Sequence, residues 1–133
     1  MEEILKFLKD NPTFYVGTVD EDGNPDIRPF GVVAEINGAI HIQTGMVKDC
    51  YKQMVAHPRI CICDFSKESG QWLRLYADAV PDDSVETNQA MLDENPMLKD
   101  KYAAGDGNCV SMRLENVKAT LYSFTEEPRS YEF

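Results

Sequence analysis

The chain has 133 residues, of which 43% are hydrophobic, and its 23 acidic residues against 13 Lys and Arg give a formal net charge of −10. This length and composition are typical of one domain with its own hydrophobic core, so we expect residues 1–133 to form a single domain. The acidic balance argues against binding to nucleic acid, which requires clustered Lys and Arg, and no apolar stretch approaches the roughly 20 residues of a membrane-spanning helix.

The first third of the chain predicts a helix followed by an antiparallel meander. Apolar residues recur at helical spacing in residues 2–10, and Asn11-Pro12 ends that segment. Three strands, rich in β-branched and aromatic residues, are expected at 14–20, 25–36 and 39–44. Asn37-Gly38 is the strongest hairpin signal, because a type I′ turn requires a positive φ at both central residues.

The rest of the chain predicts two further helices and four further strands. The first of these helices carries an apolar stripe formed by Val47, Cys50, Tyr51, Met54 and Val55. The second begins at 81–84 and runs to about Glu94. The strands are expected at 59–65, 71–80, 109–114 and 117–124, the last two joined tightly at Glu115-Asn116, and the tail from Thr125 is polar. Hairpins between helices favour a mainly β fold, a closed antiparallel barrel with peripheral helices.

The cysteines and histidines do not indicate a metal site. Cys61 and Cys63 form only a C-x-C pair within an apolar strand. The two histidines, His41 and His57, complete no zinc-binding spacing. We therefore expect the four cysteines to be buried as small apolar residues, namely Cys50, Cys61, Cys63 and Cys109. The acidic N-terminus, where a signal peptide would be basic, favours a cytoplasmic location.

The segment from Thr44 to Lys48, where a strand gives way to a helix, is a candidate phosphate site. The start of a helix presents unpaired N–H groups, and Gly45 allows a ligand to approach the backbone. Thr44 offers a hydroxyl, either to a phosphate or as the helix N-cap. Lys48 would oppose the helix dipole in the first turn, which a bound anion would offset. The alternative is a simply capped helix with a solvated lysine.

Arg28-Pro29-Phe30-Gly31, within the second predicted strand, is another candidate. Proline cannot donate to a strand ladder, and a glycine two residues later supports an irregular strand whose backbone groups could meet a planar ligand. The guanidinium of Arg28 suits a phosphate. An ordinary edge bulge with a surface arginine explains the pattern equally well.

Trp72, Arg74 and Tyr76 share one face of a strand whose other face is apolar. Aromatic residues with one arginine on an outward face are typical of the core of a protein interface. They could also stack on a ring system, or form a second packing layer under a helix.

No motif in the sequence indicates acid–base or nucleophilic catalysis. There is no Ser-His-acid motif, no Walker loop and no G-x-G-x-x-G. Catalytic residues are therefore not assigned, and the protein is either not an enzyme or an enzyme whose cofactor does the chemistry.

Six segments, taken in chain order, resemble one known family. They are T-V-D-E-D-G-N-P-D-I-R-P-F-G-V-V (18–33), the Asn37-Gly38 hairpin, I-Q-T-G-M-V-K-D-C-Y-K-Q (42–53), H-P-R-I (57–60), W-L-R-L-Y-A-D-A-V (72–80) and Y-S-F-T-x-E-P (122–128). Together they cover nearly the whole chain, and their order is similar to that in the pyridoxamine 5′-phosphate oxidase-like family of FMN-binding split-barrel proteins.

The resemblance implies a six-stranded, Greek-key-like split barrel and a homodimer with two FMN sites at the subunit interface. Along the flavin and its ribityl chain it places Arg28, Pro29, Phe30 and Gly31. At the phosphate it places Thr44 and Lys48, with Gln43 and Gly45 nearby. From the partner subunit it brings Trp72 and Arg74.

The implied function is that of an FMN-dependent oxidoreductase, which passes electrons between a nicotinamide donor and a small acceptor. True pyridoxamine 5′-phosphate oxidases carry a C-terminal segment whose tryptophan and arginines hold the substrate, whereas the only tryptophan here is Trp72. We therefore expect a flavin reductase or oxidase of another substrate. The alternative is a non-catalytic flavin, haem or deazaflavin binding or sensing module of the same fold, with His41 or His57 as the haem ligand.

Overall fold

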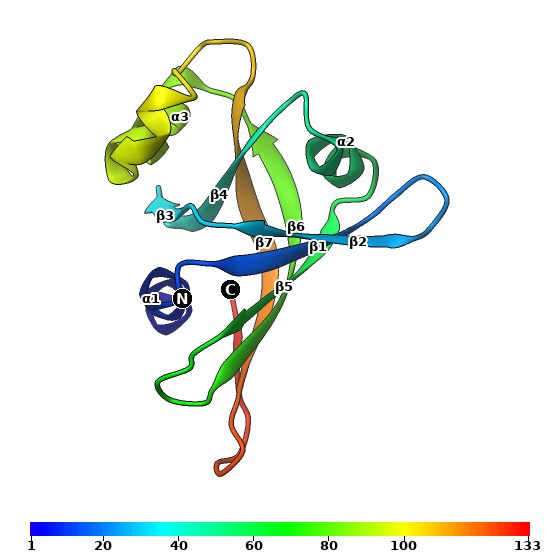
Figure 1. Ribbon diagram of the computed structural model, residues 1–133, viewed down its shortest axis with the longest axis vertical. Coiled ribbons are helices and arrows are strands. Elements are labelled where there is room, and N and C mark those ends of the chain that lie inside the picture. Colours follow the sequence, from blue (N-terminus) through cyan, green and yellow to red (C-terminus); the bar gives the residue numbers. More distant parts are fainter.

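Antiparallel strands with a few peripheral helices build the molecule (Figure 1). In the computed structural model, which describes residues 1–133, the elements are α1 (Glu2–Asp10), β1 (Phe14–Val19), β2 (Pro25–Phe30), β3 (Val33–Ile36), β4 (Ala39–Gly45), α2 (Asp49–Ala56), β5 (Arg59–Phe65), β6 (Trp72–Asp82), α3 (Val85–Glu94), the 3-10 helix η1 (Pro96–Asp100), β7 (Cys109–Tyr122) and β8 (Arg129–Glu132). The mainly β class is confirmed, although one sheet of eight strands replaces the six that the resemblance implied.

The strand expected at 25–36 is divided into two strands at opposite ends of the sheet. The strand order is β2-β1-β5-β6-β7-β4-β3, so β2 pairs only with β1 and β3 only with β4. Gly31 and Val32 lie between them, outside any strand. Both predicted hairpin pairings are confirmed, but the three strands do not form one continuous meander, because the middle strand is divided. Each hairpin pairs strands that are neighbours in the sequence. β1 also pairs with β5, and β4 also pairs with β7. Turn residues carry no information about such long-range pairing.

β7 is one continuous strand of 14 residues, where a tight turn at Glu115-Asn116 was predicted. Asn116 has a φ of 50°, and the register with β6 shifts between Tyr76 and Asp78. The extra residue forms a bulge, and the Nδ2 of Asn116 donates to Asp78 Oδ2 at 2.8 Å. The turn-forming asparagine therefore marks a bulge. The tail also contains a strand that was not predicted, since β8 pairs with β7.

The helices lie close to their predicted positions. α1 buries Ile4 and Leu8, and the Oγ of Ser84 caps α3 by accepting from the N–H of Thr87 at 3.3 Å. α2 begins later than its apolar stripe suggested, at Asp49, and leaves Val47 71% exposed. None of the helices has the length and apolar character needed to cross a membrane.

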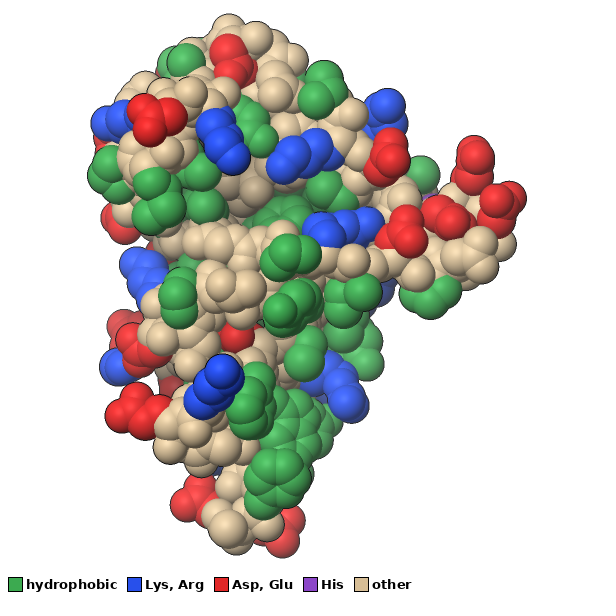
Figure 2. Space-filling model, viewed as in Figure 1, with side chains coloured by type: hydrophobic (Ala, Val, Ile, Leu, Met, Phe, Trp, Pro, Cys, Tyr) green, Lys and Arg blue, Asp and Glu red, His purple; other side chains and the backbone are tan.

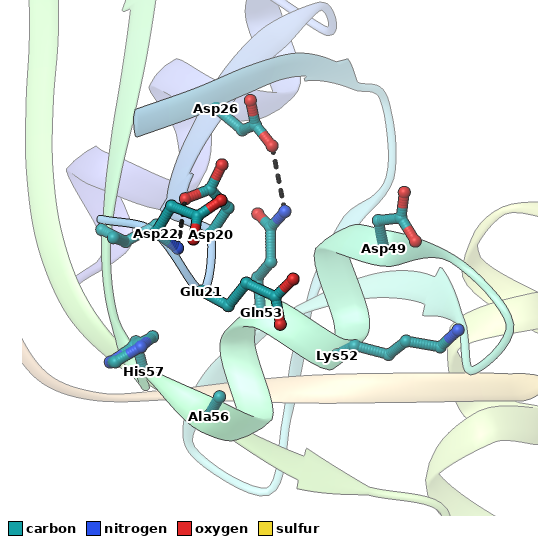
Figure 3. A pocket seen from close by; sticks show the side chains of 10 residues that line it. Asp20, Glu21, Asp22, Asp26, Asp49, Lys52, Gln53, Ala56 and His57 are labelled. Carbon is teal, nitrogen blue, oxygen red and sulfur yellow. Dashed lines mark hydrogen bonds between the residues drawn. The ribbon is translucent and has the colours of Figure 1, made fainter. Parts of the chain in front are cut away.

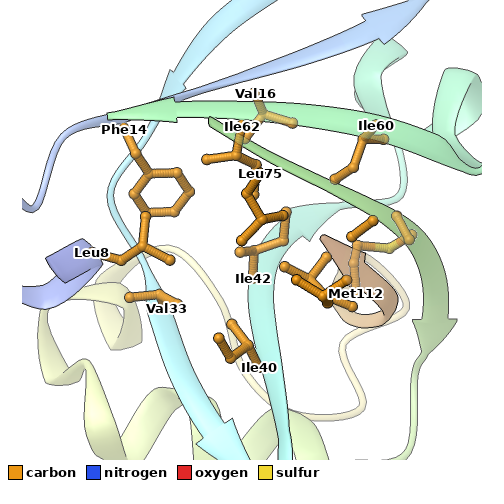
Figure 4. Packing of buried hydrophobic residues seen from close by; sticks show 14 of the residues in the cluster. Leu8, Phe14, Val16, Val33, Ile40, Ile42, Ile60, Ile62, Leu75 and Met112 are labelled. Carbon is orange, nitrogen blue, oxygen red and sulfur yellow. The ribbon is translucent and has the colours of Figure 1, made fainter. Parts of the chain in front are cut away.

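The core fills the space that the curved sheet encloses. Side chains from β1 and β5 face those from β4 and β7, and Leu8 of α1 packs beside Phe14 at one end (Figure 4). The four cysteines divide between two environments. Cys50 and Cys109 are buried as predicted, whereas Cys61 is half-buried and Cys63 is exposed. These last two alternate with core residues on β5, so they lie on its outer face.

Candidate functional site

The break between β2 and β3 lies beside a cavity of about 200 Å³ whose walls come from three separate parts of the chain. The lining residues are Arg28, Pro29, Phe30, Gly31 and Val32; Gln43, Thr44, Lys48 and Cys50; and Leu98, Lys101 and Tyr102. Seven of the ten predicted cofactor-binding residues are among them. On this side of the molecule the surface is hollowed beneath the part that carries α2 and α3, and Lys and Arg side chains gather along the hollow (Figure 2).

Arg28 is held in place on the floor of this cavity by bonds to β1. One guanidinium nitrogen, Nη1, donates to the carbonyl oxygen of Val16 at 3.1 Å and to Thr18 Oγ1 at 2.7 Å. Its ion pair with Asp26 is long, at 4.0 Å, and the Arg28 side chain is 24% exposed. Arg28 is therefore a fixed, half-buried positive charge beside the cavity, whereas the alternative was a surface arginine on an edge bulge.

Lys48 is the N-cap residue of α2, with extended backbone angles, so it lies one position before the helical turn where it was predicted. No carboxylate lies within 4.0 Å of its ammonium group, as the seven ion pairs of the chain involve other cations. No side chain caps α2, so its first N–H groups remain available. The start of α2 thus offers both a free cation and unpaired donors.

Thr44 does not cap α2, which corrects one of the two roles proposed for it. It is buried at the end of β4, and its Oγ1 lies 3.4 Å from Cys50 Sγ. Because Thr44 lines the cavity, its hydroxyl remains a possible donor to a ligand there.

Gln43 is oriented by a buried polar network that the sequence did not indicate. Its Nε2 donates to Cys109 Sγ at 2.7 Å, and its Oε1 lies 3.1 Å from Ser111 Oγ. Ser111 Oγ is also 2.8 Å from Asn88 Oδ1, and its single proton can serve either acceptor. Burial raises the pKa of Cys109 to about 11, with Asp106 adding to the effect, so the thiol stays protonated at neutral pH.

Gly45 is adjacent to the cavity, but it does not line it. A Cβ at this position would lie 3.0 Å from Asn108 Oδ1 and 3.1 Å from the Tyr102 hydroxyl. The glycine therefore permits close approach of another part of the chain, where approach of a ligand was predicted. No motif in the sequence links η1 to the strands, so Leu98, Lys101 and Tyr102 were not predicted as site residues.

Trp72 and Arg74 lie far from the cavity within one chain. They begin β6, whose other end, Asp82, is paired with Ser111 beside Gln43. Trp72 stacks on Tyr122 with 5.4 Å between ring centroids, and the Arg74 guanidinium lies 5.3 Å from the centroid of the same ring. Neither lines the cavity.

The outward face of β6 and its neighbours is exposed and rich in aromatic residues. Tyr15, Phe65 and Tyr76 are 45%, 50% and 42% exposed. Arg74 and Lys118 line a shallow pocket of about 480 Å³ on this face. Neither cation has a carboxylate within 4.0 Å. We refer to Tyr15, Phe65, Trp72, Arg74 and Tyr76 as the outer face.

A second cavity, of about 530 Å³, lies between the β1–β2 turn and α2 and is acidic, whereas the cavity beside Arg28 and Lys48 is basic (Figure 3). Its acidic lining residues are Asp20, Glu21, Asp22, Asp26 and Asp49. One lysine, Lys52, and the amide of Gln53, which donates to Asp26 Oδ2 at 2.9 Å, accompany them. This cavity repels anions and is not a phosphate site.

The two histidines do not line the cavity formed by Arg28, Lys48 and Lys101. His57 lines the acidic one. His41 is 2% exposed, its Nδ1 lies 3.0 Å from the carbonyl oxygen of Ala39, and burial lowers its pKa. No group of three or more His, Cys, Asp or Glu side chains is arranged to hold a metal ion. The assignment of His41 or His57 as a haem ligand stays a prediction.

The chain is similar to a known protein family and to several solved structures. A family model described as pyridoxamine 5′-phosphate oxidase matches residues 1–119. A comparison with curated proteins finds no match. Among solved structures, a NimC/NimA family protein from Clostridium acetobutylicum is 34% identical, with a TM-score of 0.95 over 100% of this chain and 92% of that one.

Two more distant structures share the fold. A pyridoxamine 5′-phosphate oxidase-related, FMN binding protein from Nostoc punctiforme PCC 73102 is 16% identical, with a TM-score of 0.68 over 99% of this chain and 95% of that one. General Stress Protein 26 from Bacillus anthracis str. Sterne is 13% identical, with a TM-score of 0.79 over 99% and 97% of the two chains.

Proposed function

The chain belongs to the pyridoxamine 5′-phosphate oxidase family, and from this premise we propose that it is an FMN-binding flavoprotein that acts as an oxidoreductase. One observation carries the proposal. Arg28 comes from β2, whereas Thr44 and Lys48 come from the end of β4 and the start of α2, yet all three line a single cavity in a chain whose net charge is −10. A phosphate is the group that such a set of donors suits best.

Different residues of the cavity would bind different parts of FMN. Arg28 is fixed by its bonds to β1, whereas Lys48 is free to move onto an anion, and both would contact the phosphate with the N–H groups at the start of α2. Gly31 and Val32 belong to no strand, so their backbone groups are available to a flat polar ring at the open edge between β2 and β3.

The lining of the cavity contains no carboxylate and no imidazole. The chain itself would contribute binding, orientation and positive electrostatic potential. When bound, FMN would supply the redox chemistry, taking electrons from a nicotinamide donor for a small acceptor.

A homodimer would complete the site. A cavity of about 200 Å³ is smaller than the roughly 300 Å³ or more that small-molecule sites usually occupy, so it suits part of FMN and leaves the rest to another surface. The outer face presents aromatic rings and Arg74, which are suited both to burial between subunits and to stacking on a ring. We therefore assign Trp72 and Arg74 to the site of the partner subunit.

The test is the absorption spectrum of the purified protein after addition of FMN and gel filtration. A flavin band that elutes with the protein at the dimer position is expected. Elution of all FMN as free ligand would contradict the proposal. A Soret band in the protein as purified would instead favour a haem-binding module of the same fold.

A further inference from the structure

We propose that Lys101 and Tyr102, which follow η1, form a second wall of the phosphate site in which Lys101 contacts the phosphate together with Lys48. This inference rests on the proposed function, because it assigns the phosphate of that ligand to the cavity. It extends the site beyond every residue predicted from the sequence, since those of the cavity come from β2, β4, the start of α2 and the segments between them.

The charges at the cavity support this assignment. Lys48 and Lys101 both line it, and neither has a carboxylate within 4.0 Å. Lys99, two residues earlier, is paired with Asp93 at 3.0 Å and does not line the cavity. Two like charges beside one cavity of about 200 Å³ repel each other unless an anion lies between them.

Hydrogen bonds join the segment that carries Lys48 to the segment that carries Lys101, so the two lysines belong to one structural unit. The N–H of Met46 donates to the carbonyl oxygen of Asn108 at 2.7 Å, and the N–H of Val47 donates to Asn108 Oδ1 at 3.2 Å. These bonds fasten the segment before Lys48 to the loop that follows Tyr102. Gly45 allows the contact, because a side chain there would press on both Asn108 and Tyr102.

Hydrogen bonds to the Asp106 carboxylate stabilise the same loop. Its carboxylate accepts from the N–H groups of Ala103 at 3.1 Å, Asn108 at 2.8 Å and Cys109 at 2.7 Å, and these bonds lower its pKa. The connection from η1 to β7 is therefore ordered. The Tyr102 side chain lines the cavity, so its hydroxyl can donate to a ligand there.

The experiment compares Lys101→Met with Lys99→Met in the full-length protein. Both substitutions remove a charge and keep an aliphatic stem, but only the first changes the cavity. Titration with FMN and with riboflavin, followed by fluorescence, gives the dissociation constants. For Lys101→Met we expect FMN to bind at least about tenfold more weakly, because one charge-assisted hydrogen bond is lost. Riboflavin should bind as it does to the wild type. Lys99→Met should match the wild type for both ligands.

The outcomes separate this inference from the proposed function. If Lys101→Met binds FMN as tightly as the wild type while Lys48→Met does not, Lys101 is not part of the site and the flavoprotein proposal stands. If the wild type binds no FMN, inorganic phosphate decides the inference. Phosphate that raises the melting temperature of the wild type but not of Lys101→Met supports the two-lysine site without flavin, and phosphate that protects neither overturns it.

Discussion

Lys48 is the residue whose charge the proposed function uses most directly, because it is free of any ion pair at the start of α2. Lys48→Ala should weaken FMN binding by about 1.5–3 kcal/mol, the range for a hydrogen bond to a charged group. Riboflavin, which lacks the phosphate, should bind nearly as before. Fluorescence titration with both flavins measures the difference, and Lys52→Ala, on the acidic side of α2, is the control. An equal loss for both flavins would place the phosphate elsewhere.

Asp64 is a buried carboxyl group with a single hydrogen-bond partner. It is 2% exposed, its Oδ2 has no hydrogen-bond partner, and its Oδ1 accepts only from the N–H of Phe65 at 2.9 Å. Burial raises its pKa from 3.8 to about 7, against a smaller opposing effect of the Phe65 bond. The folded state therefore holds this proton more tightly than the unfolded state, so the free energy of unfolding should fall as the pH rises from 3.8 to about 7.

Asp64→Asn should remove this dependence, because the amide carries no charge. We expect the variant to gain about 1–3 kcal/mol relative to the wild type at pH 8, with a smaller gain at pH 5. Urea unfolding at the two pH values measures it, and the exposed Glu68→Gln serves as the control. A gain of the same size at both pH values would show that ionisation of Asp64 is not the cause.

At the scale of elements, the contact between the end of β4 and the η1–β7 loop determines the shape of the site. Gly45→Ala would place a methyl group 3.0 Å from Asn108 Oδ1, so the Asn108 side chain would have to move. This movement should break the hydrogen bond that Asn108 Oδ1 accepts from the N–H of Val47. We expect a loss of about 1 kcal/mol in the free energy of unfolding, the value of one hydrogen bond, together with weaker FMN binding.

Gly17→Ala is the matched control for this substitution. Gly17 lies within β1, and the nearest atom to an added Cβ there, the carbonyl oxygen of Cys61, is at an ordinary 3.6 Å. Urea unfolding and FMN titration of both variants give the comparison. If Gly45→Ala binds FMN as well as Gly17→Ala does, the contact has no part in shaping the site.

At the scale of the whole molecule, the outer face is the surface that a second subunit would cover. Trp72→Ala removes the ring that stacks on Tyr122 and should make dissociation of the proposed dimer measurable at low micromolar concentration. Sedimentation velocity over a dilution series measures it, and Val85→Ala, 55% exposed on α3, is the control. An unchanged association constant would assign Trp72 to packing within one chain.

The local features of the fold could be predicted from the sequence because they depend on neighbouring residues. Asn37-Gly38 lies at positive φ between β3 and β4, Ser84 caps α3, and the alternation along β6 separates its buried face from its outer face. The motifs at Arg28 and Lys48 could likewise be located in the sequence, since each places a cation near a proline or glycine in an acidic chain, and their role in binding stays a prediction.

What only the tertiary structure decided is how these local pieces meet. The sequence by itself determined that hairpins, helices and two basic motifs exist, because turns, caps and periodicity are properties of adjacent residues. It could not show that β2 and β3 separate to opposite edges, that β7 is unbroken, or that η1 brings Lys101 to the same cavity as Lys48. Those features follow from pairings between residues distant in the chain, which depend on packing of the whole core and leave no pattern in any single segment.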